Sequence, residues 1–262
     1  ELTGKPLVVH VHATSFDRSS DQNIDTRVYE IEKKGMEAAD RVITVSDLTR
    51  NIVITKYGIN PDKVVTVHNA VDFSGRSEMK VERGVDDKVV TFLGRITFQK
   101  GPEYFIEAAA KVLKRCPGVR FVMAGSGDMM NRSIRQVARL GISDRFHFTG
   151  FLRGTDVQKM FALSDVYVMP SVSEPFGISP LEAMRSGVPS VISHQSGAAE
   201  VLKYAFKVDF WDVDAMADQI YALLKYPALA DFASKYGYDE VNTLKWNNAA
   251  AKIKKVYESV IK

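Results

Sequence analysis

Short apolar runs of strand length alternate with longer amphipathic segments along most of the chain. The runs are almost continuously hydrophobic, which is typical of strands that are buried on both faces of a parallel sheet. This alternation predicts an α/β fold, with doubly wound parallel sheets covered by helices. The predicted strands are 7–11, 41–45, 64–67, 88–93, 119–124, 146–149, 166–169 and 189–192. The clearest predicted helices are 103–114, 130–140, 155–163 and 177–185.

A charged, glycine-containing segment between residues 72 and 87 interrupts the alternation and suggests a domain boundary. The strands and helices after it suffice for a complete doubly wound domain, whereas about three strands before it are too few for one. We therefore expect residues 1–78 to be the C-terminal part of a truncated Rossmann-like domain, and residues 79–245 to be a complete one. The start at Glu1, a few residues before a strand, also indicates a fragment.

The last segment of the chain, residues 246–262, is amphipathic. Ile253, Val256, Tyr257 and Val260 fall on one helical face, and several lysines lie elsewhere. We therefore predict a closing helix that packs this face on the surface of a domain.

The composition of the chain indicates which kinds of partner and which cellular compartment to expect. The 35 lysine and arginine residues nearly balance the 32 aspartate and glutamate residues, which leaves a net charge of +3. Basic residues are not interleaved with aromatic ones, so a nucleic-acid partner is not expected. Cys116 is the only cysteine, and no signal peptide or spanning apolar segment stands out. We expect a cytoplasmic, reducing environment.

Two glutamates flank a Pro/Gly turn that directly follows the predicted strand 166–169. Glu174 precedes the turn, and Glu182 lies in the helix that the turn opens. Ligands of open parallel sheets bind beyond the carboxyl ends of the strands, so both acids would face the crevice and suit a polyhydroxylated ligand. Two structural alternatives stay open. Glu182 could complete a capping box with Ser179 as the N-cap, and Glu174 could be a solvated loop acid.

Two cations, Arg95 and Lys100, lie in the loop between the predicted strand 88–93 and a helix that begins near Pro102. The free amides and the dipole of a helix N-terminus favour anions. Arginine can bind two phosphate oxygens while lysine acts as a point charge, so the pair could neutralise a diphosphate without a metal. The alternative is two exposed cations on a surface loop.

Glycine and histidine supply two further candidate features. Gly125 and Gly127 follow a predicted strand, but Met130 replaces the third glycine of the dinucleotide-binding fingerprint. A βα turn that needs positive φ explains them as well as nucleotide contact does.

His10 and His12 alternate on a strand and therefore share a face. We expect His12 to contact ligand, with a structural histidine as the alternative, and we expect no metal because a third ligand is missing.

Taken together, these motifs resemble those of the retaining glycosyltransferases of family 4, which have the GT-B fold. The resemblance covers nearly the whole chain. It rests on Gly94-Arg95, Lys100-Gly101, Gly125-Ser126-Gly127, Pro170-Ser171, Glu174-Pro175-Phe176-Gly177, Glu182-Ala183-Met184 and the upstream segments 39–46 and 67–72. Family members have two facing Rossmann-like domains, which bind mainly the acceptor and mainly the nucleotide sugar. By resemblance, this chain holds the end of the acceptor domain, the donor domain and a terminal helix that crosses back.

The resemblance also implies a role for each candidate residue. Arg95 and Lys100 would bind the donor diphosphate and offset the charge that develops as the glycosidic bond breaks. Glu182 would accept hydrogen bonds from the ribose hydroxyls, and Glu174 would meet the sugar hydroxyls. His12 would approach the sugar from the opposite domain. The remaining expected donor-binding residues are Phe176, Gly177, Ile178, Gly94, Gly125 and Gly127.

Two departures from the family pattern bear on the identity of the donor. Ala70 stands where the family commonly has glycine, and Ser196-Gly197-Ala198-Ala199-Glu200 replaces the more usual Gly-Gly run before a glutamate. The added Cβ atoms would narrow the sugar or pyrophosphate pocket. They bear less on the class of reaction.

The leading expectation is an enzyme that transfers a hexosyl unit, with retention, from a nucleoside diphosphate sugar to a carbohydrate or lipid-linked acceptor. No cofactor is expected besides this donor substrate. Peripheral membrane contact would involve the missing N-terminal region. Two other functions stay open: a nucleotide-binding module without catalysis, and a GT-B epimerase or phosphorylase. The kind of mechanism, by a carboxylate nucleophile or by same-face internal return, also stays open.

Overall fold

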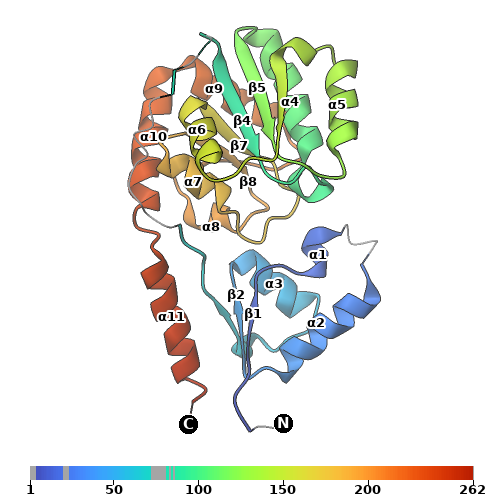
Figure 1. Ribbon diagram of the computed structural model, residues 1–262. Helices are drawn as coiled ribbons and strands as arrows, with labels where there is room; N and C mark the ends of the chain where they lie inside the picture. Colours follow the sequence, from blue (N-terminus) through green and yellow to red (C-terminus); the bar gives the residue numbers. More distant parts are fainter. Residues whose placement is uncertain (1–3, 20–23, 72–80, 83, 85, 262) are drawn as a thin grey trace.

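The computed structural model describes residues 4–19, 24–71, 81, 82, 84 and 86–261. These residues form two parallel sheets flanked by helices, one above the other in Figure 1. The expected α/β fold with Rossmann-like sheets is therefore confirmed. We call the described residues up to Val71 the three-strand unit and residues 86–245 the six-strand unit. Within the boundary segment expected between residues 72 and 87, residues 72–80, 83 and 85 lie outside the described residues.

The three-strand unit contains a parallel sheet in the order β1-β2-β3. Its strands are β1 (Val8–Val11), β2 (Arg41–Thr44) and β3 (Val64–Thr66). Its helices are α1 (Ser15–Arg18), α2 (Thr26–Ala38), α3 (Asp47–Thr55) and a short 3₁₀ helix, Pro61–Lys63. Val42, Val53 and Tyr57 are buried between this sheet and its helices. All three strands were predicted from sequence to within one residue at each end.

The six-strand unit contains a second parallel sheet, with the strand order β6-β5-β4-β7-β8-β9 among the described residues. Its strands are β4 (Lys88–Leu93), β5 (Val119–Ala124), β6 (Phe146–Gly150), β7 (Val166–Met169), β8 (Ser190–Ser193) and β9 (Phe206–Val208). Its α-helices are α4 (Pro102–Arg115), α5 (Met130–Arg139), α6 (Thr155–Leu163), α7 (Ser179–Arg185), α8 (Ala198–Val201), α9 (Val213–Lys225) and α10 (Pro227–Val241). Two 3₁₀ helices span Phe98–Lys100 and Ser143–Arg145.

The strand order of the larger sheet reverses at its centre. The chain runs outward from β4 through β5 to β6, and then returns to pair β7 with the other edge of β4. In open parallel sheets, a ligand crevice lies beyond the carboxyl ends of the strands at such a switch point. The loops after β4 and β7 carry the predicted cations and acids, so the topology places both at this crevice.

Alternating side chains of the central strands fill two separate cores. Val166 and Val168 of β7 pack in one buried cluster with residues of α4 and α9. Tyr167 and Met169 of the same strand pack in another cluster with residues of α6 and α7. Because successive side chains of a strand point to opposite faces, the sheet is covered by helices on both sides. This double burial explains why the strand sequences are continuously apolar.

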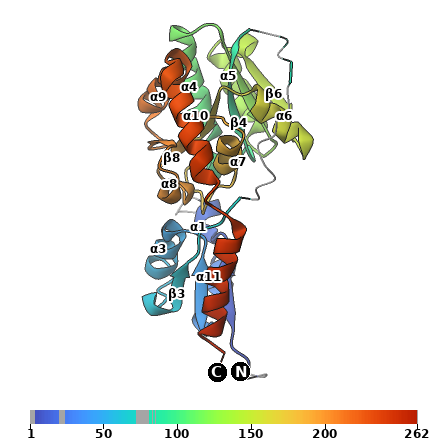
Figure 2. The ribbon, with the colours of Figure 1, turned by 90° about the vertical axis from the view of Figure 1, so that its left-hand side faces the viewer.

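The last helix, α11 (Trp246–Glu258), leaves the six-strand unit and runs beside the three-strand unit (Figures 1 and 2). Ala249 and Val256 are buried against Ile43 and Val67 of the smaller sheet. This helix lies in the segment for which the sequence predicts a closing helix. The predicted apolar face is wrong in one position, because Tyr257 is 47% exposed.

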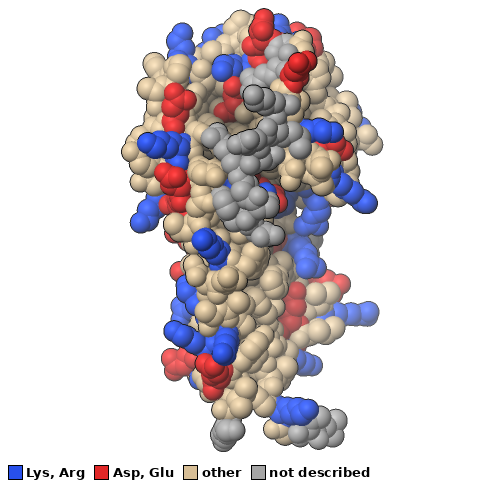
Figure 3. Space-filling model, turned by 60° about the vertical axis from the view of Figure 1, so that its left-hand side comes forward, with Lys and Arg blue, Asp and Glu red and all other residues tan. Residues whose placement is uncertain are grey.

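Lysine, arginine, aspartate and glutamate side chains are intermixed over the face drawn in Figure 3. On this face, therefore, no broad area of one charge gathers among the described residues. Among the described helices, none combines the length and the hydropathy that a membrane crossing needs.

Candidate functional site

A cavity of about 440 Å³ opens beside the carboxyl ends of β4 and β5. Arg95 from the loop after β4 and Glu182 from α7 both line it. Gly94 and Gly125 contribute backbone to its wall, and Phe151 and Gln158 line another side. The cavity therefore joins a cation and a carboxylate that are distant in the sequence, at the switch point of the sheet.

Glu182 is free to face this cavity because it does not form the capping box that was the structural alternative. The N-cap of α7 is Ile178, and it makes no side-chain cap hydrogen bond. Ser179 instead accepts a hydrogen bond on Oγ from the Tyr167 hydroxyl at 2.7 Å. Burial raises the pKa of the Glu182 carboxyl, and the nearby Arg185 partly opposes this shift. The site thus holds a carboxyl group that a ligand with hydroxyl donors would stabilise in its ionised form.

The other predicted acid and cation form an ion pair. Lys100 Nζ donates to Glu174 Oε2, and the hydroxyl of Ser171 lies 3.4 Å from the same oxygen. Glu174 is only 7% exposed, which contradicts the alternative of a solvated loop acid. Its backbone N–H donates to Gln195 O at 2.9 Å, so the loop is tied to the segment after β8. The pair is therefore held in place by both backbone and side chain.

The ion pair and the cavity lie next to each other. A Cβ atom placed on Gly94, which lines the cavity, would lie 3.9 Å from the Lys100 side chain. The charges of both Glu174 and Glu182 add to the upward shift of the Tyr167 pKa, whose main cause is burial. Both carboxylates thus lie close to one buried phenol. Four predicted residues, Arg95, Lys100, Glu174 and Glu182, meet in one region, although Lys100 and Glu174 are not part of the cavity lining.

Arg95 is exposed, and its guanidinium donates to Gln99 Oε1 at 3.3 Å. The short 3₁₀ helix Phe98–Lys100 separates Arg95 from α4, which begins at Pro102 as predicted. Arg95 therefore precedes this helical turn, and Lys100 is its last residue. This arrangement leaves the Arg95 guanidinium accessible to an anion in the cavity, whereas the Lys100 ammonium already faces a carboxylate.

Gly125 and Gly127 are required mainly by close packing. A Cβ atom on Gly125 would lie 1.8 Å from Gly94 O, and one on Gly127 would lie 2.2 Å from Ile96 O. Backbone hydrogen bonds, including Ile96 N–H to Ser126 O at 2.9 Å, join the two loops. Only Gly125 also lines the cavity. The predicted positive φ is present at Gly125, with a φ of 149°, but not at Gly127, which close packing on Ile96 explains instead. Contact with a ligand remains a prediction for Gly125.

Three predicted donor-binding residues lie in the loop between Glu174 and α7. Phe176 and Gly177 are buried, whereas Ile178 is 41% exposed. Phe176 O accepts a hydrogen bond from the Ala198 N–H at 2.6 Å. These residues shape the loop behind Glu174 and are not among those that line the cavity.

His12 follows β1 in the three-strand unit and is exposed. Its ring centroid lies 4.2 Å from that of His10, which confirms that the two histidines share a face. Both line a cavity of about 280 Å³, together with Arg18 and Glu32. Burial lowers the pKa of His10, and His12 adds to this shift. Within the described residues, His12 makes no hydrogen bond to the acids and cations of the six-strand unit.

Sequence reasoning missed several residues around the two cavities. Phe151 and Gln158 line the larger one, and the position of Phe151 directly after the strand β6 is the signal that could have indicated it. Arg18 and Glu32 line the smaller one, where no local pattern marks them. Sequence reasoning also gives no role to His68, which contacts Glu200 of the opposite unit. Such contacts between distant segments have no signature in a single sequence.

Comparison with protein families identifies the group to which this arrangement belongs. The profile described as glycosyl transferases group 1 matches residues 76–240, and that of glycosyltransferase family 4 matches residues 1–74. The chain belongs to the glycosyl transferases group 1 family. The resemblance expected from sequence motifs is thereby confirmed, including the GT-B type of fold.

Two curated relatives give the extent of this likeness. An uncharacterized glycosyltransferase from Methanocaldococcus jannaschii is 34% identical over 212 residues, which cover 76% of this chain and 54% of that protein. A D-inositol 3-phosphate glycosyltransferase from Mycobacterium marinum is 30% identical over 247 residues, covering 88% of this chain and 52% of that protein. The chain thus spans about half the length of these curated relatives.

Solved structures show the same fold. Anabaena HepE, in a crystal structure with UDP and glucose, superimposes with a TM-score of 0.84 at 21% sequence identity. The match covers 97% of this chain and 72% of the Anabaena chain. Both sheets of this group 1 chain therefore lie within the part of the fold that the two proteins share.

Proposed function

We propose that this chain belongs to a glycosyltransferase that moves a hexosyl unit from a nucleoside diphosphate sugar to an acceptor hydroxyl, with retention of anomeric configuration. Membership of the group 1 family supports the class of reaction. The observation that carries the proposal is the adjacency of the Lys100–Glu174 ion pair to the cavity lined by Arg95 and Glu182. In this proposal, residues 79–245 bind the donor, residues 1–78 carry part of the acceptor side, and residues 246–262 join the two.

The donor would lie across the switch point of the larger sheet. The ribose hydroxyls would donate to the ionised Glu182 carboxylate, and the diphosphate would pass Gly94 to reach Arg95 and Lys100. Negative charge accumulates on the leaving diphosphate as the bond to the sugar breaks, so both cations would stabilise the transition state. Because Lys100 is already held by Glu174, it requires little reorganisation at that moment.

Glu174 would accept hydrogen bonds from the sugar hydroxyls, and the loop that contains Phe176, Gly177 and Ile178 would set its position. The acceptor would enter from the three-strand unit, where His12 lines the cavity of about 280 Å³. A link between the sides is present near Glu174, since the Ser173 hydroxyl donates to Asp17 Oδ1 at 2.8 Å. The acceptor in this proposal is a carbohydrate or a lipid-linked sugar.

The test uses UDP-, GDP- and ADP-hexoses with the full-length protein, and NMR of the first products. We expect one donor to be consumed, with the anomeric configuration kept in the product or in the slowly hydrolysed sugar. Calorimetry with UDP, GDP and ADP on the present chain supplies a matched binding measurement. Binding without turnover would support a nucleotide-binding module, and an epimerised or phosphorolysed donor would support the other chemistries. The absence of both nucleotide binding and donor turnover would contradict the proposal.

A further inference from the structure

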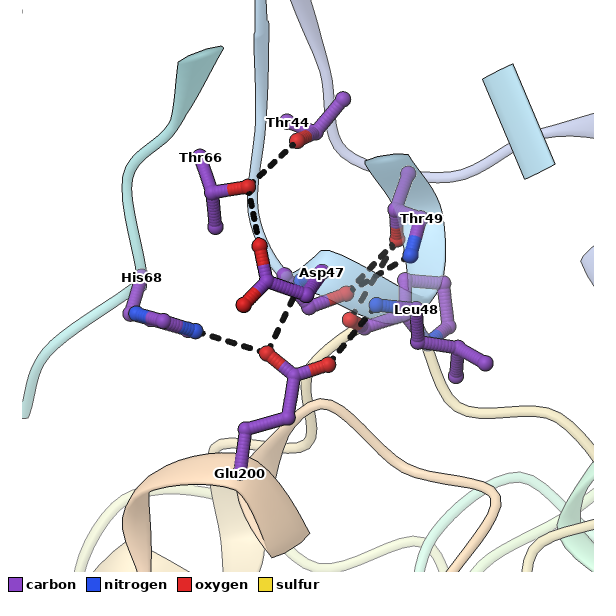
Figure 4. Close-up of polar contacts among 9 residues, drawn as sticks. Thr44, Asp47, Leu48, Thr49, Thr66, His68 and Glu200 are labelled. Atoms are coloured by element: carbon purple, nitrogen blue, oxygen red, sulfur yellow. Dashed lines mark hydrogen bonds and ion pairs between the residues drawn. The ribbon is translucent and has the colours of Figure 1, made fainter. Parts of the chain in front are cut away.

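Glu200 lies on α8 of the six-strand unit, and its carboxylate reaches across to the three-strand unit (Figure 4). Oε2 accepts a hydrogen bond from the backbone N–H of Asp47 at 2.8 Å, and Oε1 accepts one from that of Leu48 at 2.7 Å. The Nε2 atom of His68 lies 2.7 Å from Oε2. All three partners belong to the three-strand unit, so one carboxylate joins the two units.

The two backbone amides open the helix α3, where they have no acceptor within the helix itself. The N-cap residue, Ser46, satisfies a different donor, because its Oγ accepts from the Thr49 N–H at 3.0 Å. Glu200 therefore completes the cap of α3 from outside the unit. A carboxylate at this end of a helix is favoured by the helix dipole, and hydrogen bonds to an ionised acceptor are about twice as strong as neutral ones.

Side chains at the end of β3 and just after it hold the contact from the other side. Thr66 Oγ1 donates to Asp47 Oδ1 at 2.6 Å, which ties the first residue of α3 to the neighbouring strand. His68 faces Glu200, and the two side chains keep 25% and 23% of their exposure. A contact that is this shielded from water is stronger than an ion pair on an open surface.

The same segment supports the loop that carries Glu174. Gly197 N–H donates to Glu174 O at 3.0 Å, and Ala198 N–H donates to Phe176 O at 2.6 Å. Gly197 is the N-cap of α8, and Ala198 is the first residue of this short helix, two positions before Glu200. A shift of Glu200 would therefore move α3 relative to the loop that carries Glu174.

The interface around the contact is also tightly packed. A Cβ atom on Gly197 would lie 2.5 Å from the Ser46 Cβ and 2.4 Å from Pro175 O. Thr49 Oγ1 lies 3.4 Å from the same carbonyl oxygen. The N-terminal end of α3 thus rests directly on the loop between Glu174 and α7, with Glu200 at its edge.

We infer that Glu200 is a positioning residue, which caps α3 across the two units and so fixes the placement of the His12 side relative to the Lys100–Glu174 pair. The relevance of this placement to turnover rests on the proposed function. The cap of α3 by Glu200 does not rest on it, because this contact exists without any ligand. Loss of the carboxylate would leave two N–H groups without an acceptor and free the units to change their spacing.

The geometric test compares Glu200→Gln with Glu240→Gln. Glu240 is a matched control because its carboxylate also accepts from two successive backbone amides, those of Lys203 and Tyr204, within the six-strand unit. Spin labels at Lys34→Cys and Lys225→Cys, in a Cys116→Ser background, report the distance between the units by double electron–electron resonance.

We expect one narrow distance distribution for the parent and for Glu240→Gln, and a broad one for Glu200→Gln. The side-chain oxygen of glutamine can accept a hydrogen bond from one of the two backbone N–H groups. Its NH₂ group would face the other N–H group, which would lose its acceptor. His68→Gln, which keeps a side-chain donor, should stay close to the parent, whereas His68→Phe should broaden the distribution. A narrow distribution in both Glu200→Gln and His68→Phe would overturn the inference.

The functional test measures kcat and nucleotide Kd for the same variants in the full-length protein. Because misplacement of reacting groups slows the chemical step, Glu200→Gln should lower kcat about tenfold or more and leave the nucleotide Kd within about twofold. A normal kcat with a broadened distance distribution would overturn the positioning role while leaving the proposed function intact. Absence of transfer in the parent would contradict the proposed function, and the distance measurement would still test the contact.

A further experiment, with a chelator and an added metal ion, distinguishes the proposed hydrogen-bonded contact from a metal site. One ligand atom each of Asp47, His68 and Glu200 lies within 4.8 Å of the others. If the groups satisfy one another as described, EDTA and added Mn²⁺ should leave the distance distribution unchanged. A distribution that broadens with EDTA and narrows again with Mn²⁺ would assign a cation site to these residues and overturn the inference.

Discussion

Lys100 and Glu174 are 74 positions apart in the chain, yet their side chains form an ion pair that is largely removed from water. Removing one member leaves the other charge partly buried and unpaired, which is costly. In the proposed reaction, the same removal also takes away a group whose contact strengthens as charge develops. At the residue scale, the account therefore predicts large effects on turnover from single substitutions in this pair.

Lys100→Ala should lower turnover by about 100-fold or more, because one preorganised charge at the leaving group is lost. Lys111→Ala is the matched control, since Lys111 also pairs with an acid, Asp214, but on the surface away from the cavity. Exposed pairs contribute little, so the control should keep nearly full activity. Steady-state kinetics with the preferred donor measure both. A Lys100→Ala enzyme with near-normal turnover would contradict the assigned role.

The raised pKa of Glu182 gives a dependence on pH with a definite sign. The folded chain holds this proton more tightly than the unfolded chain, so the group favours folding at low pH and disfavours it as pH rises through the raised pKa. Ribose hydroxyls would bind the ionised carboxylate. Nucleotide affinity should therefore fall as pH decreases toward that pKa.

Calorimetric titration between about pH 5 and pH 8 measures this effect, given the ordinary carboxyl pKa of about 4.3. Glu182→Gln is the control for titration of the nucleotide itself, because it lacks the ionising group and keeps a similar shape. The parent should lose affinity more steeply than Glu182→Gln at the acid end. Parallel pH profiles for the two proteins would show that Glu182 does not bind the nucleotide.

At the scale of elements, the prediction from sequence was most accurate where local pattern and burial agree. The strands β4, β5 and β7 begin and end at the predicted residues, because their runs are apolar throughout and buried on both faces. The strand β9 was missed, since Phe206–Val208 is too short to show a pattern. The helix α7 begins at Ser179 rather than at 177, because Gly177 has a φ of +93°, which lies outside the right-handed helical region.

The loops after β4 and β5 supply a prediction about stability. Gly127→Ala should lower the free energy of unfolding by about 1–3 kcal/mol, because its Cβ would overlap the Ile96 backbone, which is held by hydrogen bonds. Gly35→Ala, inside the helix α2 with open space around it, should instead raise it by up to about 1 kcal/mol. Urea denaturation measures both. Equal midpoints for the two variants would contradict the packing argument.

At the scale of the whole molecule, the proposed function depends on contacts that join segments far apart in the sequence. The helix α11 covers Ile43 and Val67 of the smaller sheet after the chain has completed the larger one. Glu200 caps α3 across the same boundary. Sequence motifs singled out Arg95, Lys100, Glu174 and Glu182 as candidates, because each lies beside a recognisable strand end or turn. They did not identify the cross-unit contacts, because a carboxylate that caps a distant helix leaves no local pattern.

The account depends most on where a nucleotide sugar binds. A crystal structure of the chain with UDP-, GDP- or ADP-hexose, chosen by calorimetry, tests this directly. We expect the diphosphate within hydrogen-bonding distance of Arg95 and Lys100, the ribose on Glu182 and the sugar beside Glu174. A nucleotide sugar bound elsewhere, or one in this cavity that contacts none of these four side chains, would contradict the account.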